Sequence, residues 1–188
     1  MIAMVPPDDA AILQGLARGD ARAFDGVYER LRAPLYSFLV RLSGRTQLAE
    51  DLLQETWIRL VRHARDLPPE TQLRPWLYTV ARNLYRSHRR WALLDASRLR
   101  ELGLLPGQVP ESPFESLAAN DIERGLEHAL AALPLVDREV VLLCVVSAFE
   151  PSDAAGILGI SAEAVRQRLA RARAKLRERL KLGEITWR

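Results

Sequence analysis

Apolar residues recur three and four positions apart through almost every segment of the chain, as they do on one face of an α-helix. We find no run in which apolar and polar residues alternate between turn signals, so the pattern predicts no β-strand. It therefore indicates an all-α fold. The predicted helices cover Ala10–Ala17, Ala21–Leu42, Leu48–Ala64, Pro75–Leu93, Asp121–Ala131, Asp137–Ser147, Ser152–Leu158 and Ala162–Leu180.

One segment rich in helix-breaking residues interrupts this pattern. Residues 102–116, LGLLPGQVPESPFES, contain three prolines and two glycines, a composition typical of a linker. We therefore predict two small helical domains joined by a flexible linker, the second containing a helix-turn-helix. The first domain covers residues 10–95, the linker 96–118 and the second domain 119–182, with tails at 1–9 and 183–188.

The helix-turn-helix prediction comes from the last two helices. PSDAAGIL is typical of a short first helix, Gly159 permits a tight turn, and Ser161 is a favourable N-cap for the helix that follows. On that second helix the apolar residues fall on one face. The opposite face carries Arg166, Gln167, Ala170 and Arg171, and Arg168 and Arg173 flank the apolar stripe.

The charges of the chain are arranged in blocks. The formal net charge is only +3, yet residues 161–181 hold eight cations and two acids, and residues 74–100 hold seven cations and one acid. An acidic block lies between them, with ten acids and two cations in residues 101–160. Because each neutralised phosphate releases condensed counterions, we expect the basic helix-turn-helix to bind duplex DNA. The alternative is a basic face that is only solvated.

The segment LRPWLYTVARNLYRSHRRW, Leu73–Trp91, forms the other basic block. On a helical wheel one face is apolar, and the arginines Arg82, Arg86, Arg89 and Arg90 gather on another. Tyr78 and Tyr85 lie at the border, where their rings could stack against an unstacked base. The alternative is that the tyrosines complete the core and the arginines form a face that is only solvated.

The segment LAEDLLQETWIRLV, Leu48–Val61, has an apolar face and an acidic face. Ile58 falls among the polar residues Glu50, Asp51, Gln54 and Glu55. An apolar side chain ringed by carboxylates is typical of a partner-binding hot spot. The alternative is that another helix covers Ile58.

Other chemistry is sparse in this sequence. The single cysteine, Cys144, lies in the apolar run VVLLCVV, and His63, His88 and His128 show no metal-ligand spacing. We therefore predict no metal, no cofactor and no catalytic residues. No apolar run reaches the roughly 20 residues that span a bilayer, and the first residues lack the features of a secretory signal. We expect a cytoplasmic protein that is not inserted in a membrane.

Four of these segments, in this order, resemble bacterial extracytoplasmic-function (ECF) sigma factors of the sigma-70 class. The segments are AEDLLQETWIRL, RPWLYTVARNLYRSHRR, ALAALPLVDREVVLL and DAAGILGISAEAVRQRLARARAKL, and the resemblance spans roughly residues 10–182. It implies a subunit that directs bacterial core RNA polymerase to promoter DNA and starts transcription. Its first domain would be sigma-2 and its second sigma-4, without enzymatic activity of its own.

The resemblance also implies roles for particular residues. In the family, the helix matching Leu48–Val61 docks on a coiled coil of the polymerase, which assigns core binding to Asp51, Gln54, Glu55 and Ile58. The loop and helix that follow melt the minus-ten element and hold a flipped base, which assigns contacts to Arg74, Trp76, Tyr78, Arg82, Asn83, Arg86, Arg89 and Arg90. The last helix reads the minus-thirty-five element with Arg166, Gln167, Arg168, Ala170, Arg171 and Arg173.

Partners and alternatives follow from this interpretation. An anti-sigma factor that covers the surface around Ile58 is expected alongside the polymerase and the promoter. An autonomous helix-turn-helix regulator, which binds an operator as a dimer, would explain residues 157–180 but leaves the two preceding helices unexplained. A DNA recombinase with such a module would need a nucleophile in a catalytic fold that these helices do not resemble.

Overall fold

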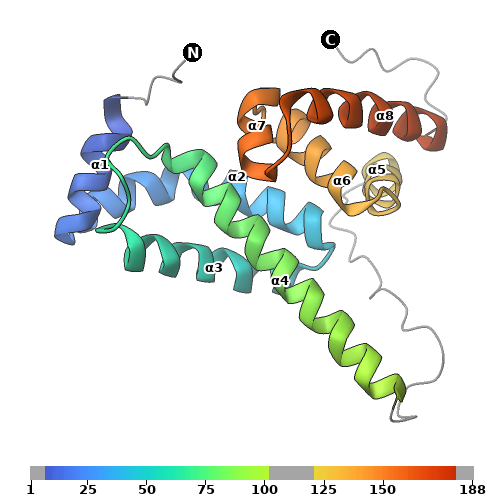
Figure 1. Ribbon diagram of the computed structural model, residues 1–188, viewed down its shortest axis with the longest axis horizontal. Helices are drawn as coiled ribbons and strands as arrows, with labels where there is room; N and C mark the ends of the chain where they lie inside the picture. Colours follow the sequence, from blue (N-terminus) through green and yellow to red (C-terminus); the bar gives the residue numbers. More distant parts are fainter. Residues whose placement is uncertain (1–6, 102–120, 181–188) are drawn as a thin grey trace. The chain divides into compact units, whose positions relative to one another are not determined.

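The computed structural model describes residues 7–101 and 121–180, and within these ranges it confirms the all-α prediction, with no strand (Figure 1). The helices are α1 (Pro7–Arg18), α2 (Ala21–Ser43), α3 (Thr46–His63), α4 (Leu73–Glu101), α5 (Asp121–Ala131), α6 (Leu135–Val141), α7 (Pro151–Leu158) and α8 (Ala162–Leu180). A π-helical segment, Leu142–Val146, follows α6 directly. The chain divides into two compact units, Met1–Leu39 with Gln47–Ser112 and Val40–Thr46 with Pro113–Arg188.

The first unit forms its core from α2, α3 and α4. Apolar side chains from all three helices are buried, and aromatic rings join α2 to its neighbours. Phe38 on α2 lies against Tyr78 on α4, with ring centroids 5.1 Å apart. Tyr28 on α2 lies against Trp57 on α3, also at 5.1 Å. Such pairs add to the stability that burial of their apolar area provides.

Helix α1 is fastened to this core by polar contacts. The Asp9 side chain is buried; its Oδ1 accepts a hydrogen bond from Arg30 Nη2 at 3.0 Å and its Oδ2 accepts one from the backbone N–H of Leu73 at 2.9 Å. Asp9 thus satisfies an amide in the first turn of α4, which no intrahelical carbonyl can reach. Near the other end of α1, Arg65 Nε donates a hydrogen bond to the Ala17 carbonyl at 3.0 Å. Helix α1 begins at Pro7, three residues before the predicted start at Ala10 and within the predicted tail 1–9.

Helix α4 is longer than predicted. It continues to Glu101, eight residues beyond the predicted end at Leu93, and so includes the first residues of the predicted linker 96–118. No proline or glycine occurs between Trp76 and Glu101, so nothing in the sequence stops the helix. Its second half extends away from α2 and α3, and Trp91 and Leu93 are exposed (Figure 1). The rest of the predicted linker and the tail at 183–188 lie outside the described residues.

The second unit contains the helix-turn-helix, in which α8 packs against α5, α6 and α7. Gly159 ends α7 with φ 68°, a left-handed conformation that suits glycine, and the Ser161 hydroxyl accepts a hydrogen bond from the Ala164 amide at 3.1 Å. The structure thus confirms the predicted turn at Gly159 and the predicted N-cap at Ser161. The predicted single helix Asp137–Ser147 is instead α6 followed by a wider π-turn, in which the Ser147 amide bonds the Leu142 carbonyl five residues back.

Candidate nucleic-acid and partner-binding sites

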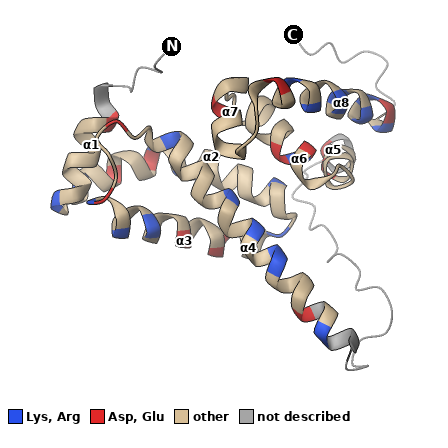
Figure 2. Cartoon of the chain, viewed as in Figure 1, with Lys and Arg blue, Asp and Glu red and all other residues tan. Residues whose placement is uncertain are grey.

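The second unit presents the clearest candidate DNA surface, on helix α8. Val165, Ala172 and Leu176 are buried against the rest of the unit and fix the rotation of the helix. The predicted base-reading residues are all exposed: Arg166, Gln167, Ala170 and Arg171. Figure 2 shows basic residues spread along α8. Because small and long side chains share this face, the backbone can approach a groove while the arginines reach into it.

A carboxylate at the start of α8 holds two of these side chains. Glu163 Oε2 accepts hydrogen bonds from Arg166 Nε at 3.1 Å and Nη2 at 2.9 Å, and its Oε1 accepts one from Gln167 Nε2 at 3.1 Å. The hydrogen bonds from Arg166 and then Gln167, with the charge of Arg166, lower the pKa of Glu163. Glu163 therefore stays ionised at neutral pH. The sequence reasoning missed this residue, although its spacing of three and four from Arg166 and Gln167 is the signal for such contacts.

Arg168 makes a contact within the second unit that the sequence did not predict. Its Nη1 lies 2.9 Å from Oδ1 of Asp137 on α6, and the Asp137 side chain is only 9% exposed. A carboxylate so nearly buried needs a charged partner, because an unpaired charge removed from water is costly. The Arg168 guanidinium therefore holds α8 against α6, and its DNA contact stays a prediction. Arg173, by contrast, is exposed.

On α4 the structure corrects the prediction for the border residues. Tyr78 is 0% exposed, Tyr85 8% and Arg82 6%, so none of them offers a surface to DNA in this structure. The alternative interpretation of the tyrosines, that they complete the core, is confirmed. The physical reason is that the first half of α4 packs against more than one helix, as the Phe38–Tyr78 contact with α2 and the Asp9–Leu73 contact with α1 show.

The remaining predicted residues of α4 stay near the surface. Asn83, Arg86 and Arg90 are exposed, and Arg74, Trp76 and Arg89 are half-buried. The guanidinium of Arg74 lies over the ring of Tyr78, 5.9 Å from its centroid. The buried Arg82 donates a hydrogen bond from Nη1 to Oδ1 of Asn83 at 3.4 Å. Arg82 therefore helps to orient Asn83, which is exposed and is itself a predicted DNA contact.

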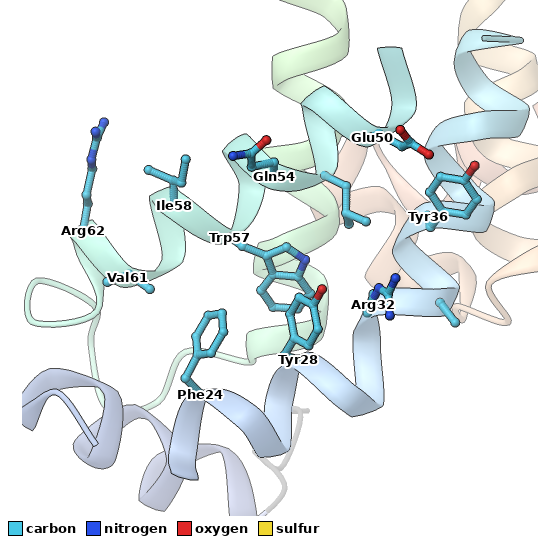
Figure 3. A pocket seen from close by; sticks show the side chains of 12 residues that line it. Phe24, Tyr28, Arg32, Tyr36, Glu50, Gln54, Trp57, Ile58, Val61 and Arg62 are labelled. Atoms are coloured by element: carbon cyan, nitrogen blue, oxygen red, sulfur yellow. The ribbon is translucent and has the colours of Figure 1, made fainter. Parts of the chain in front are cut away.

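Helices α2 and α3 enclose a groove of about 750 Å³. Figure 3 shows the rings of Phe24 and Tyr28 on α2 facing that of Trp57 on α3, while Ile58 projects from α3 away from these rings. Val61, at one end of the groove, is 58% exposed. Ile58 is half-exposed and lines the groove, so the structure contradicts the alternative that another helix buries it.

Of the predicted polar residues, Gln54 lines this groove, whereas Asp51 and Glu55 lie on α3 outside its lining. Asp51 and Gln54 are exposed, and Glu55 is half-buried and accepts a hydrogen bond from Arg59 Nε at 3.0 Å. The sequence reasoning missed the rings of Phe24 and Tyr28. Their spacing of four residues on α2, which stacks them at 5.6 Å between centroids, is the signal that could have identified them.

Comparison with known proteins identifies the family. Residues 27–92 match sigma-70 region 2, and residues 123–176 match sigma-70 region 4. The chain is 37% identical over 147 residues to the ECF RNA polymerase sigma factor EcfG of Rhodopseudomonas palustris, covering 76% of each chain. The chain belongs to the ECF group of sigma-70 RNA polymerase sigma factors. It is also 34% identical over 171 residues to the sigma factor CarQ of Myxococcus xanthus, covering 89% of this chain and 93% of CarQ.

A solved structure agrees with this assignment. The sigma factor RpoE of Bartonella quintana, in complex with the anti-sigma factor NepR, superposes on this ECF sigma factor with a TM-score of 0.69 and 28% identity, covering 87% of this chain and 100% of that one. This ECF sigma factor is therefore a DNA-binding factor for transcription initiation. An autonomous regulator is not favoured, because the α2–α4 region also matches a sigma-70 region.

The residues that the structure describes in this ECF sigma factor form no cluster of histidines, cysteines or carboxylates that could hold a metal ion. In the same residues no helix has the length and apolar character of a membrane span. Cys144 is half-buried, and desolvation by burial raises the pKa of its thiol, opposed by the charge of nearby Arg173.

Proposed function

We propose that the promoter and polymerase contacts of this sigma factor are divided among three surfaces. The α2–α3 groove binds core RNA polymerase, α4 with the segment 64–72 melts the minus-ten element, and α8 reads the minus-thirty-five element. The observation that carries this division is that each matched region exposes its own basic face, on α4 in one unit and on α8 in the other.

Core binding is supported by the anatomy of the groove. Its middle is apolar and aromatic, formed by Phe24, Tyr28 and Trp57, and the exposed Asp51 and Gln54 lie on the same helix as Ile58. An apolar centre with a polar rim is the usual composition of a protein–protein interface. Ile58→Asp should weaken core binding by at least about tenfold, because it places a charge in a hot spot. Leu93→Asp is the matched control, since Leu93 is exposed on α4 outside the groove.

Fewer residues of α4 are proposed to contact the minus-ten element than the sequence indicated. The exposed ones are Asn83, Arg86 and Arg90, and the buried Arg82 donates a hydrogen bond to Asn83. Arginines at this face would hold phosphates, and Asn83 would contact the non-template strand. Asn83→Ala should slow promoter opening, measured by permanganate reactivity of unpaired thymines. Ser87→Ala, an exposed residue one turn further along, is the control and should leave opening unchanged.

The minus-thirty-five role of α8 separates into base reading and phosphate contact. Arg171 lies on the face opposite the buried residues of α8, and Arg173 lies beside them. Arg171→Ala should change the preferred minus-thirty-five sequence. Arg173→Ala should mainly reduce the steepness of the salt dependence, by about one unit of slope. Equal effects of both changes on every sequence would contradict this division.

An anti-sigma factor is proposed as a further partner. The similar Bartonella quintana sigma factor was solved with the anti-sigma factor NepR, and the α2–α3 groove is an exposed apolar surface that such a protein could cover. We place the protein in the cytoplasm, where bacterial polymerase works. We assign it no catalytic step, because opening a duplex is a binding process and nucleotide addition belongs to the polymerase.

Transcription in vitro tests the whole proposal. The purified chain is added to bacterial core polymerase with a genomic library, and the start sites are mapped. We expect starts that share a minus-ten and a minus-thirty-five sequence and that are absent without the chain. An absence of specific starts, or tight operator binding by the chain without polymerase, would overturn the proposal.

A further inference from the structure

The Glu163 carboxylate accepts hydrogen bonds from Arg166 and Gln167, two residues to which the proposed function assigns base reading. Its Oε2 accepts both Nε and Nη2 of Arg166, at 3.1 and 2.9 Å, and its Oε1 accepts Nε2 of Gln167 at 3.1 Å. All three side chains are exposed, in the first two turns of α8. Residues at the N-terminal end of a recognition helix are those that reach base edges.

This contact limits how Arg166 can meet a base. The guanidinium has a side edge, made of Nε and Nη2, and an end edge, made of Nη1 and Nη2. Glu163 occupies the side edge and leaves Nη1 and the outer hydrogen of Nη2 directed away from the carboxylate. The end edge donates two parallel hydrogen bonds, which match O6 and N7 of guanine in the major groove.

The same carboxylate orients Gln167. An ionised carboxylate only accepts hydrogen bonds, so the amide group of Gln167 must turn its nitrogen toward Glu163. Its carbonyl oxygen then points away from Glu163 as an acceptor. Among base edges in the major groove, amino groups supply the matching donor, N6 of adenine or N4 of cytosine.

We propose that Glu163 is a positioning residue that sets base preference at the minus-thirty-five element, directing Arg166 end-on to a guanine and the Gln167 carbonyl to a base amino group. This inference rests on the proposed function of α8. Glu163 itself does not touch DNA in this scheme. It acts by removing alternative rotamers of two long side chains before they bind, so that less conformational freedom is lost on the correct sequence.

A role in fold stability alone would give different results. Exposed ion pairs three residues apart contribute little to stability, so loss of Glu163 should leave the folded unit intact. A carboxylate at the DNA-facing end of a basic helix also opposes phosphate binding. Glu163→Gln should therefore raise affinity for non-specific DNA while it lowers discrimination, two changes of opposite sign that general loss of structure would not produce.

The experiment uses the holoenzyme, core polymerase with the full-length sigma factor. Transcription is measured from a promoter with the preferred minus-thirty-five sequence and from its single-base variants. We expect Glu163→Gln to reduce discrimination at the Arg166-dependent guanine by about tenfold, within the range of one bidentate contact. Glu163→Asp keeps the charge but shortens the side chain by one methylene, and we expect a similar loss.

Two controls separate positioning from charge. Glu178→Gln removes the same charge from an exposed site near the other end of α8 and should leave discrimination unchanged. In an Arg166→Ala background, Glu163→Gln should have no further effect at the guanine position, because the side chain that it orients is gone. Thermal unfolding of each variant checks that the fold is retained.

The outcomes are distinct. If the wild-type protein discriminates among minus-thirty-five variants and Glu163→Gln or Glu163→Asp does so equally well, the inference is overturned. It is also overturned if Glu178→Gln has the same effect as Glu163→Gln, because charge alone would then explain the result. If the wild-type protein itself shows no minus-thirty-five preference, the proposed function of α8 fails first.

Discussion

The two basic helices, α4 and α8, differ in how the rest of their unit surrounds them. The first half of α4 contacts several helices, so that Arg82 and Tyr78 are buried although they lie away from the main apolar stripe. The second half of α4 extends beyond α2 and α3, and even Trp91 and Leu93 are exposed (Figure 1). Helix α8 packs against α5, α6 and α7 through one stripe and keeps its opposite face exposed along its length.

This difference teaches what a helical pattern can predict. The pattern predicts which residues share a face, but the arrangement of the neighbouring helices around that helix decides how much of its circumference is buried. On α8 a single packed stripe makes the prediction of its exposed face correct. On α4 the same reasoning fails at Tyr78, Tyr85 and Arg82, because the neighbours cover more than the apolar stripe.

The largest effect that would sharpen this comparison is expected on α4. Tyr78→Ala should lower the free energy of unfolding by about 3–5 kcal/mol, because it leaves a cavity where the ring meets Phe38. Urea unfolding measures the loss. Tyr78→Phe keeps the ring and should cost less. If Tyr78→Ala instead retained full stability but lost promoter opening, Tyr78 would be a DNA contact and the contrast would break.

The next effect separates two arginines on α8. Arg168→Ala should cost about 1–3 kcal/mol of unfolding free energy, because it leaves the nearly buried Asp137 carboxylate without its charged partner. Arg171→Ala, in the same helix, removes an exposed side chain and should cost less than about 0.5 kcal/mol. Thermal denaturation of the two variants, measured beside their minus-thirty-five preference, gives the comparison. Equal stability of both would show that Arg168 is not needed to hold α8.

A smaller effect tests how each helix begins. The start of α8 is capped locally by Ser161, whereas that of α4 is capped by Asp9 from another helix. Ser161→Ala should cost about 1 kcal/mol, as loss of an N-cap usually does. Ser161→Asp, which keeps an acceptor at the cap, should retain most of the stability. A loss as large as that of Tyr78→Ala would mean that the cap supports more than the first turn.

The smallest effect concerns titration rather than stability. Hydrogen bonds from Arg166 and Gln167 hold the pKa of Glu163 below its ordinary value of 4.5. Because the pKa of Glu163 is lower in the folded state, the stability that its contacts with Arg166 and Gln167 contribute is present above pH 4.5. That stability is lost as the pH falls through the lowered pKa. In an NMR titration, Arg166→Ala should move the pKa of Glu163 upward toward 4.5. Titration of the wild-type carboxyl at or above that value would contradict the hydrogen bonds.

Features set by neighbouring residues could be predicted from the sequence, whereas those set by distant ones could not. Gly159 and Ser161 act within a few residues of their own positions, and the structure confirms both. The contacts of Asp9 with Leu73 and of Arg168 with Asp137 join residues 64 and 31 positions apart. No local pattern specifies such pairs, so the sequence alone does not predict them.

The candidate site follows the same rule. The exposed residues of α8 and the half-exposed Ile58 could be inferred from one helix at a time. The groove beside Ile58 needs two helices, because Phe24 and Tyr28 come from α2 and Trp57 from α3. The length of α4 was missed for another reason: the apolar repeat weakens after Leu94, yet the segment contains no residue that ends a helix.

The position of Asp9 has a practical consequence for shortened versions of this protein. A deletion that begins the chain at Ala10 removes the acceptor for the Leu73 amide and the partner of Arg30 Nη2, and so acts on the start of a helix 64 residues away in sequence. We therefore expect truncation or cleavage that removes Asp9 to destabilise the start of α4 and, with it, the proposed promoter opening.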